Sequence, residues 1–367
     1  MIDGTFLFEL RNKWKGLTIF LVVALIVSGG MVQLFPVVVD AMEEDVEELK
    51  GEEKVRVEVE NGNVTLDWEP LNATHYRILE DSGSHMATSR EVDKVEEDNR
   101  TTLEYPIEEE RYFAVIAVFE DVDGNVEKEV FVGMGSTVER KSPMEELMEA
   151  PYFRAFTAGR PDVDFRYIEG FLSVELYSWW FLLVGLYLAY ISVNGITDDY
   201  EGRRLDILFS NPISRRRFLA EKFLVLAFYA FVLLSVSAAV MIGSLRSVGE
   251  LQEFGVWTAF ASMLGSWPLF LVVIAFSTLF AVKFKRSRTA VGSSLMVALV
   301  MYALHIVGNM VDALEWVTTF TILTYWDYNS VLLDRVFKAE HFLGLIILAL
   351  IIFVAAMLIF EREDIPA

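Results

Sequence analysis

The sequence contains no cysteine, so it has no disulfide framework, no thiolate metal site and no cysteine nucleophile. It also lacks the phosphate loop GxxxxGK followed by Ser or Thr, and the HExxH, GxSxG and SxxK signatures. The four histidines are scattered along the chain, at His75, His85, His305 and His341. The sequence therefore offers no candidate catalytic centre and no metal site, and any ATP chemistry would have to come from another chain.

Charged residues are absent from six long stretches. Each is long enough to cross the hydrocarbon core of a bilayer, which takes about 20 apolar residues in a helix. With 54% hydrophobic residues and a mean hydropathy of +0.39, the chain is predicted to be an integral protein of the lipid bilayer. Six crossings place both termini on one side. The stretches are Leu17–Val39, Leu176–Thr197, Phe223–Leu245, Phe254–Val282, Thr289–Val311 and Phe342–Phe360.

The charge is unevenly placed around these spans. Residues 42–169 hold 34 acidic and 14 basic residues, a net charge of −20, against −22 for the whole chain. Lys and Arg gather near span ends at residues 11–15, 203–217 and 283–288, and the positive-inside rule makes that side cytoplasmic. We therefore predict a multi-pass protein of the cell (plasma) membrane, with cytoplasmic termini and an extracytoplasmic segment over residues 42–170. The run at 283–288 is predicted to flank a span and not to bind nucleic acid.

Two segments beside the first span have their own patterns. In Thr5–Lys15, Phe6, Leu10 and Trp14 form one helical stripe, which is typical either of a helix lying in the membrane interface or of an ordinary basic flank. The acidic run Glu43–Glu53 is predicted to be a solvated spacer.

After the spacer, short segments with alternating apolar residues are separated by turn residues. Val64, Leu66 and Trp68 recur at every second position, and Asn61-Gly62 is a hairpin signal. About seven such segments in 80 residues predict an antiparallel sandwich. The predicted strands are Lys54–Glu60, Asn63–Trp68, Thr74–Glu80, Ser84–Val92, Arg100–Tyr105, Arg111–Glu120 and Val126–Gly133.

Residues 53–134 resemble the fibronectin type III module. Trp68, in VTLDW, matches its early tryptophan, and Tyr76 matches the tyrosine of its next strand. The resemblance implies a partner-binding or spacer role, and the fold alone does not decide which. The residues whose spacing is similar to the module's later core strands are Leu103, Tyr112, Val115 and Ala117.

The predicted fold class is therefore a membrane all-α protein of six transmembrane helices, with an all-β sandwich inserted between the first and second helices. Trp267-Pro268 is predicted to kink or divide the fourth span. Asp312–Glu340 is predicted to form helices at the outer interface, because its apolar runs are short and aromatic. The predicted organisation is an interfacial helix and first span over 1–41, the extracytoplasmic sandwich with its acidic spacer over 42–140, a return segment over 141–170, and spans two to six over 171–367, with a polar loop over 196–222.

Three polar residues in or beside the spans are candidates for a translocation path. Glu175 enters near the outer end of the second span, where a carboxylate is either interfacial and wet or part of a substrate path. His305 and Asn309 are four residues apart and share one face of the fifth span. They are expected either to hydrogen bond with a neighbouring helix or to contact a substrate or proton.

The polar loop Ile196–Lys222 opens acidic and closes basic between two spans. Leu205, Leu208 and Phe209 fall on one helical face, which predicts a short amphipathic helix. Asn211-Pro212 ends it. Such a helix is suited to pass force between a membrane bundle and a soluble partner.

The six spans, this loop, the N-terminal helix and the insert after the first span together resemble the permease subunits of type 2 ATP-binding-cassette transporters, the ABC-2 class. Phe360 to Asp364, FERED, is similar to the family's C-terminal ending. The loop residues that match the family's acidic-Gly-Leu-Leu-Pro-x-Ser-Arg pattern are Asp198, Asp199, Glu201, Gly202, Leu205, Asp206, Leu208, Ser210, Pro212, Ser214, Arg215 and Lys222.

The resemblance implies a transport subunit that is not itself an enzyme and binds no cofactor. A separate ABC ATPase subunit would bind ATP and Mg, and a second permease copy, identical or not, would complete the exporter. Tyr200–Phe209 would be the coupling helix. The competing hypothesis is a membrane-anchored extracellular binding or adhesion protein that works through its sandwich, although six spans exceed what anchorage needs. The residues implied in ATPase coupling are Asp198, Asp199, Glu201, Gly202, Arg203, Arg204, Leu205, Leu208, Phe209, Pro212 and Arg215.

Overall fold

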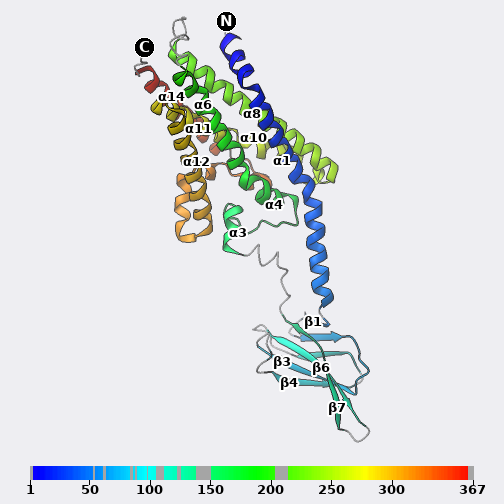
Figure 1. Ribbon diagram of the computed structural model, residues 1–367. Coiled ribbons are helices and arrows are strands. Elements are labelled where there is room, and N and C mark those ends of the chain that lie inside the picture. The colour runs from blue at the N-terminus through cyan, green and yellow to red at the C-terminus, as the bar shows by residue number, and fades with distance from the viewer. Residues whose placement is uncertain are drawn as a thin grey trace. The chain divides into compact units, whose positions relative to one another are not determined.

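The computed structural model divides into two compact units, one formed by residues 1–39 and 147–367 and the other by residues 40–146 (Figure 1). The first unit is helical and the second is a pair of β-sheets. The residues described are 3–52, 54–60, 63–82, 86, 89–96, 98–104, 111–121, 125–137, 150–202 and 214–362.

The chain begins with one long helix. Helix α1 runs without a break over Asp3–Glu52, with Pro36 inside it. The sequence predicted an interfacial helix or an ordinary basic flank before the first span and a solvated spacer after it; in the structure one continuous helix covers all three segments. The acidic run continues the helix because Glu, Leu and Lys are strong helix formers. Within the helical unit, the ring of Phe20 on α1 stacks on Tyr187, with 3.7 Å between the ring centroids.

Six helical segments are long and apolar enough to cross a membrane among the residues that the structure describes. This confirms the six predicted spans. Most extend a few residues beyond the uncharged stretches, because charged residues at the ends continue the helices. The segments are Lys15–Met42, Ile168–Glu201, Arg215–Val248, Val256–Phe284, Ser287–Met310 and Ala339–Arg362.

The second span is irregular. It contains two single turns of π-helix, η1 (Ser173–Tyr177) and η2 (Phe181–Gly185). Such turns are rare inside α-helices and often lie at functional sites. The α-helical parts of this span are α4 (Ile168–Leu172), α5 (Ser178–Trp180) and α6 (Leu186–Glu201).

The fourth span is divided in two, as the Trp267-Pro268 pair predicted. Helix α10 (Val256–Gly265) ends before Ser266, and α11 (Trp267–Phe284) begins with proline in its first turn, where the missing N–H costs no helical hydrogen bond. Helix α11 is the centre of the bundle: its residues 268–278 are all buried. It packs against α6, α8 (Arg215–Val248), α12 (Ser287–Met310) and α14 (Ala339–Arg362).

The segment between α12 and α14 folds as short helices, as predicted, and contains no span. They are η3 (Asp312–Phe320), η4 (Ile322–Tyr325) and α13 (Tyr328–Leu332). Arg335 fixes its last part, because its guanidinium donates to the Phe254 carbonyl at 2.7 Å and pairs with Glu169 at 2.5 Å. Two further short helices belong to the described part of this unit, α3 (Pro151–Phe156) and α9 (Leu251–Phe254).

The second unit is an antiparallel sandwich. One sheet has the order β1-β2-β5 and the other β4-β3-β6-β7, and both line one core. Six strands lie close to their predicted positions, whereas β4 starts six residues after its predicted start, because polar Ser84–Ser89 carries no alternation. The strands are β1 (Val55–Glu60), β2 (Asn63–Trp68), β3 (His75–Asp81), β4 (Arg90–Val95), β5 (Arg100–Glu104), β6 (Tyr112–Glu120) and β7 (Val126–Ser136).

The sandwich core contains the two aromatic residues that the sequence singled out. The Trp68 and Tyr76 rings lie 5.3 Å apart between centroids, and both side chains are buried. Val115 and Ala117 are also buried in this core, with Leu103 packed against it. One buried charge was not predicted: the carboxylate of Glu80 is bound by Arg90 at 2.7 Å and by Arg111 at 3.3 Å.

Candidate functional site

The two ends of the polar loop are held by a buried ion pair. Helix α6 ends at Glu201 and α8 begins at Arg215, so the loop starts and finishes on neighbouring helix ends. Inside them, Lys222 Nζ lies 2.7 Å from Asp199 Oδ2 and donates to the Gly195 carbonyl at 2.5 Å. Both charged side chains are buried. Buried charges of this kind require a partner, so α6 and α8 are locked in one relative position.

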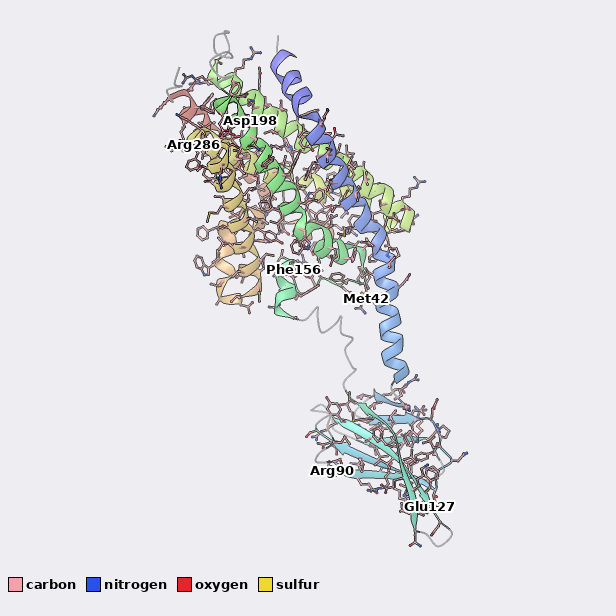
Figure 2. All side chains as sticks on the ribbon, in the orientation of Figure 1. Met42, Arg90, Glu127, Phe156, Asp198 and Arg286 are labelled. Atoms are coloured by element: carbon pink, nitrogen blue, oxygen red, sulfur yellow. The ribbon has the colours of Figure 1, made fainter. Side chains whose placement is uncertain are left out.

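A second contact ties the end of α6 to the start of α12. Glu201 Oε1 accepts from the backbone N–H of Ser287 at 2.8 Å. The Ser287 hydroxyl donates to Asn194 Oδ1 at 2.6 Å, about two helical turns before Glu201 on α6. The negative carboxylate lies at the N-terminus of α12, which is the favourable end of the helix dipole. Figure 2 shows Asp198 and Arg286 at the same end of the helical unit.

A third set of contacts ties the start of α8 to the end of α14. Arg216 forms an ion pair with Glu361, with 2.8 Å between Nη2 and Oε2. Arg215 donates to the Glu361 carbonyl at 3.3 Å. The rings of Phe218 and Phe360 stack beneath these charges, with 6.0 Å between centroids. The two ends of the loop are therefore attached to a base, in which the ends of α6, α8, α12 and α14 are bonded to one another.

Five of the eleven residues predicted for coupling lie in this described base. Asp198 is exposed, Asp199 is buried in the ion pair, and Glu201 holds the start of α12. Gly202 caps α6 and Arg215 opens α8. The remaining six lie outside the described residues: Arg203, Arg204, Leu205, Leu208, Phe209 and Pro212.

A pocket of about 390 Å³ lies at the other end of the helical unit. We call it the polar pocket. His305 and Asn309 both line it, and Asn309 Nδ2 lies 3.2 Å from His305 Nε2. The second ring nitrogen of His305 faces the hydroxyls of Thr321 and Thr324, at 3.5 and 3.4 Å. The structure therefore places these two candidates together.

Glu175 is separate from this pair. It lies on the π turn η1, half-buried, and does not line the polar pocket. Among the other residues of η1, Ser173 donates to Asn329 Oδ1 at 2.6 Å, and Asn329 does line the pocket. The irregular turn of the second span is thus linked to the pocket through Ser173 and not through the carboxylate that the sequence singled out.

Sequence reasoning missed the charges that line the polar pocket. Arg160 pairs with Asp334 at 2.5 Å, and Lys338 pairs with Asp327 at 2.5 Å. Burial of Asp327 favours its neutral form, but hydrogen bonds from Lys338 and Ser330 outweigh this effect and hold the pKa of its carboxyl below the ordinary value. The lining therefore carries two positive and two negative groups. No local pattern pairs Arg160 with Asp334, since the two residues are 174 positions apart.

Within the described ranges, no group of three or more His, Cys, Asp or Glu side chains is placed to hold a metal ion. The candidate sites are thus the ends of the polar loop at one end of the bundle and the polar pocket at the other.

Six apolar helices define the chain as a multi-pass membrane protein. The ABC-2 family transporter protein family matches it over residues 8–365, nearly the whole chain, and the protein belongs to this family. It is therefore a membrane permease of the ABC transporter class, a transport subunit whose family implies an ABC ATPase as partner. No curated protein matches the chain.

Proposed function

We propose that the protein is the permease subunit of an ATP-driven exporter, and that it couples ATP hydrolysis by a separate ATPase subunit to substrate translocation. The observation that carries the proposal is the braced base of the loop. The ion pair Asp199–Lys222 and the contact of Glu201 with Ser287 connect the loop ends to three membrane helices. A push on the loop would therefore move those helices as a group.

In the proposed cycle, two permease copies and two ATPase copies alternate between inward-open and outward-open states. The coupling helix Tyr200–Phe209 docks on the ATPase, with Leu205, Leu208 and Phe209 as its apolar contact. ATP and Mg bind in the ATPase, because this chain has no phosphate loop. ATP shifts the equilibrium only by binding the two states differently, so the docked helix must stay attached while the ATPase dimer closes.

The arginines at the start of α8 support this proposal. Arg215, Arg216 and Arg217 occupy the first turn of a helix, where positive charge is opposed by the helix dipole. Arg216 and Arg217 are each offset by a carboxylate, Glu361 and Glu221. Three positive charges in this turn are unfavourable for the helix, and the two carboxylates offset that cost. We take this basic turn as part of the surface that faces the ATPase.

We further propose that the sandwich is a fibronectin type III-like module on the extracytoplasmic side, with both termini of the chain in the cytoplasm. The support is the strand order of its two sheets and the packing of Trp68 on Tyr76. It would serve as a binding or spacer module. The alternative, in which the sandwich alone works and the spans only anchor it, has no support from the bonded base of the loop.

The test replaces both Leu205 and Leu208 with Asp in the full chain and co-expresses its partner ABC ATPase. Loss of each buried apolar contact is expected to weaken ATPase binding by about tenfold or more, so co-purification and coupled hydrolysis should fail together. The matched control is Leu71→Asp, an exposed leucine of the sandwich, which should change neither. If the double variant still co-purifies fully and couples hydrolysis to transport, the coupling assignment is wrong.

A further inference from the structure

An apolar groove lies on the helical unit where the fourth span is divided. Its volume is about 310 Å³ and its lining is almost entirely hydrocarbon and aromatic. Trp257 is 69% exposed and Phe231 is 44% exposed, so the groove opens on the surface of the bundle. Both residues belong to membrane-spanning helices, so in a bilayer this opening faces acyl chains. Its main side chains are Phe231, Trp257, Phe260, Leu264, Trp267 and Phe342.

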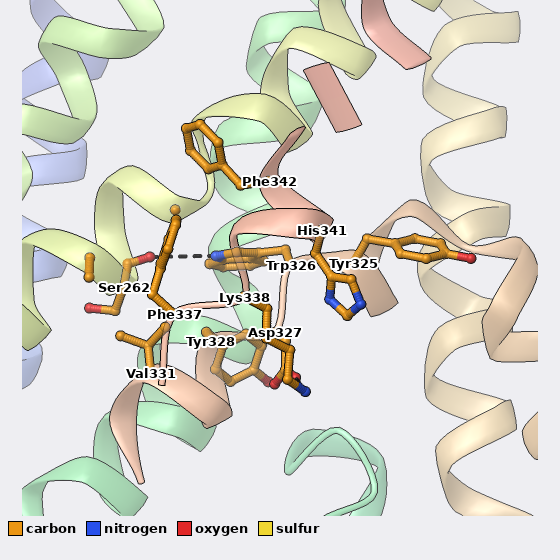
Figure 3. Close-up of a pocket in the computed structure, with 12 residues that line it drawn as sticks. Ser262, Tyr325, Trp326, Asp327, Tyr328, Val331, Phe337, Lys338, His341 and Phe342 are labelled. Atoms are coloured by element: carbon orange, nitrogen blue, oxygen red, sulfur yellow. Dashed lines mark hydrogen bonds and ion pairs between the residues drawn. The ribbon is translucent and has the colours of Figure 1, made fainter. Parts of the chain in front are cut away.

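A small junction pocket of about 20 Å³ lies between this groove and the polar pocket. It shares Gly265 and Phe342 with the groove, and Asp327 and Lys338 with the polar pocket. In Figure 3, Phe342 and Phe337 lie on one side of the junction, and Lys338, Asp327 and His341 on the other. Neighbouring hollows thus share lining residues, and the lining changes from apolar side chains in the groove to charged side chains in the polar pocket.

The junction offers specific polar groups to a ligand. Nδ1 of His341 is buried and has no hydrogen-bond partner, which leaves a polar atom available to an occupant. Trp326 and Tyr328, beside the carboxylate of Asp327, form an aromatic and acidic surface. Aromatic faces next to a carboxylate favour ammonium groups through cation–π and ionic attraction. The indole of Trp326 is itself held by the Ser262 carbonyl at 3.5 Å.

The polar pocket offers charge of both signs. The pairs Arg160–Asp334 and Asp327–Lys338 leave its lining with no net charge, and Asp162, beside the pocket, also binds Arg160. A ligand that carries one positive and one negative group can exchange with the second pair: its anion meets Lys338 while its cation meets Asp327. A purely anionic or purely cationic ligand would leave one member of that pair without a partner in a half-buried site.

We propose that these three hollows bind an amphiphile with a single acyl chain and a zwitterionic headgroup. The chain lies in the apolar groove, the anionic group next to it meets Lys338, and the terminal ammonium lies in the polar pocket against Trp326 and Asp327. If this amphiphile is the cargo of the exporter, the proposal names the substrate class and rests on the proposed function. The binding site itself does not depend on that function. Each hollow other than the junction has the volume of a small-molecule site, roughly 300 Å³ or more.

The test uses the full-length permease in nanodiscs without its ATPase, so that failure of the coupling proposal cannot affect the result. The probe is lysophosphatidylcholine with a photoreactive acyl chain, and the labelled peptides are mapped. Saturable labelling of α10 is expected. Gly265→Leu closes the junction, since a Cβ at Gly265 already lies 3.4 Å from Phe337. If the leucine side chain displaces about two methylene groups of the bound acyl chain, labelling should fall by about tenfold or more.

The matched control is Gly243→Leu, the same change on α8 where a Cβ meets nothing within 4 Å; it should label as the wild type does. Trp257→Ala, at an exposed position, lowers labelling without a fold defect. Probes with the same chain but a neutral glycerol or an anionic phosphoglycerol head should label less, and Lys338→Gln should reduce the preference for the choline head over the neutral glycerol head, because it removes the cation that meets the phosphate. Equal labelling by all three heads, strongest labelling by the anionic one, or labelling unchanged in both Gly265→Leu and Trp257→Ala would overturn the proposal.

Discussion

Lys222 and Asp199 lie on two different spans and form a buried ion pair, with 2.7 Å between Nζ and Oδ2. The ammonium also lies 4.9 Å from the centre of the Phe218 ring. The pair thus joins the last turns of α6 to the second turn of α8, directly below the polar loop. In the proposed coupling, this pair would carry movement of the loop to α6 and α8, together with the contacts of Glu201 and Arg216.

Removing one member of this pair is expected to destabilise the protein strongly. Lys222→Met leaves the Asp199 carboxylate buried without its cation, which costs about 3–5 kcal/mol. The double change Asp199→Leu with Lys222→Met removes both charges and should lose much less than the two single changes together. The control is Glu221→Gln, which breaks a more exposed pair with Arg217 and should cost less than about 1 kcal/mol. Melting temperature of the purified protein measures all four; a Lys222→Met effect no larger than the control would contradict the prediction.

The sandwich is expected to fold as an independent domain. The strand β7 runs to Ser136, so the expressed piece should cover residues 53–137. Its circular dichroism should be that of a β protein with a cooperative melt. Trp68→Ala should destabilise it by about 3–5 kcal/mol, because the indole fills the core. Phe131→Ala is the control, since Phe131 is 62% exposed. A random-coil spectrum with no melt, or equal effects of the two changes, would argue against this core.

The side-chain contacts of Arg335 are expected to stabilise the protein by more than its strained backbone destabilises it. Its φ is +59°, a conformation that favours glycine. Arg335→Gly would relieve this strain but would lose the bonds to Glu169, Phe254 and Thr258, so a net loss of about 2–4 kcal/mol is expected. Ala158→Gly is the matched change at a φ of +51°, at a residue whose side chain forms no hydrogen bond, and should be neutral or stabilising. Thermal unfolding of both variants gives the comparison. Equal effects would show that the side-chain contacts of Arg335 do not stabilise the protein.

The pair Asp327–Lys338 predicts a loss of stability in acid. The folded state lowers the pKa of Asp327 below its ordinary value of 3.8, so the folded protein binds this proton less readily than the unfolded chain does. The stability it contributes is therefore fully present above that ordinary value and is lost as pH falls through the lower folded value, with a slope of at most about 1.4 kcal/mol per pH unit. Melting temperature should fall less steeply below pH 4 in Asp327→Asn than in the wild type. Asp312→Asn, at an exposed position, should leave the slope unchanged; the reverse ranking would show that another group dominates.

Local patterns in the sequence predicted much of the fold. Uncharged length marked the six spans, alternation at Val64, Leu66 and Trp68 marked β2, and Pro268 marked the division of the fourth span. Patterns failed where two signals overlapped in one helix, as in α1, since helix propensity carried the backbone across the change from apolar to acidic residues.

The candidate sites were less predictable, because they depend on contacts between distant segments. The polarity of residues 196–222 marked the loop, but nothing local pairs Asp199 with Lys222 or Glu201 with Ser287. In the same way, Arg160 and Asp334 are 174 residues apart, so their ion pair could not be inferred from spacing. His305 and Asn309 were found because a single helix brings them together.

The two π turns of the second span have a consequence for its length. Each π turn holds about one more residue than the α turn that could replace it. Deleting one residue within Phe181–Gly185 would convert η2 to α geometry and keep Asp199 facing Lys222. The same deletion within α6, before Asp199, would rotate that carboxylate by about 100° away from its partner. In this span the effect of losing a residue is therefore decided by which turn loses it.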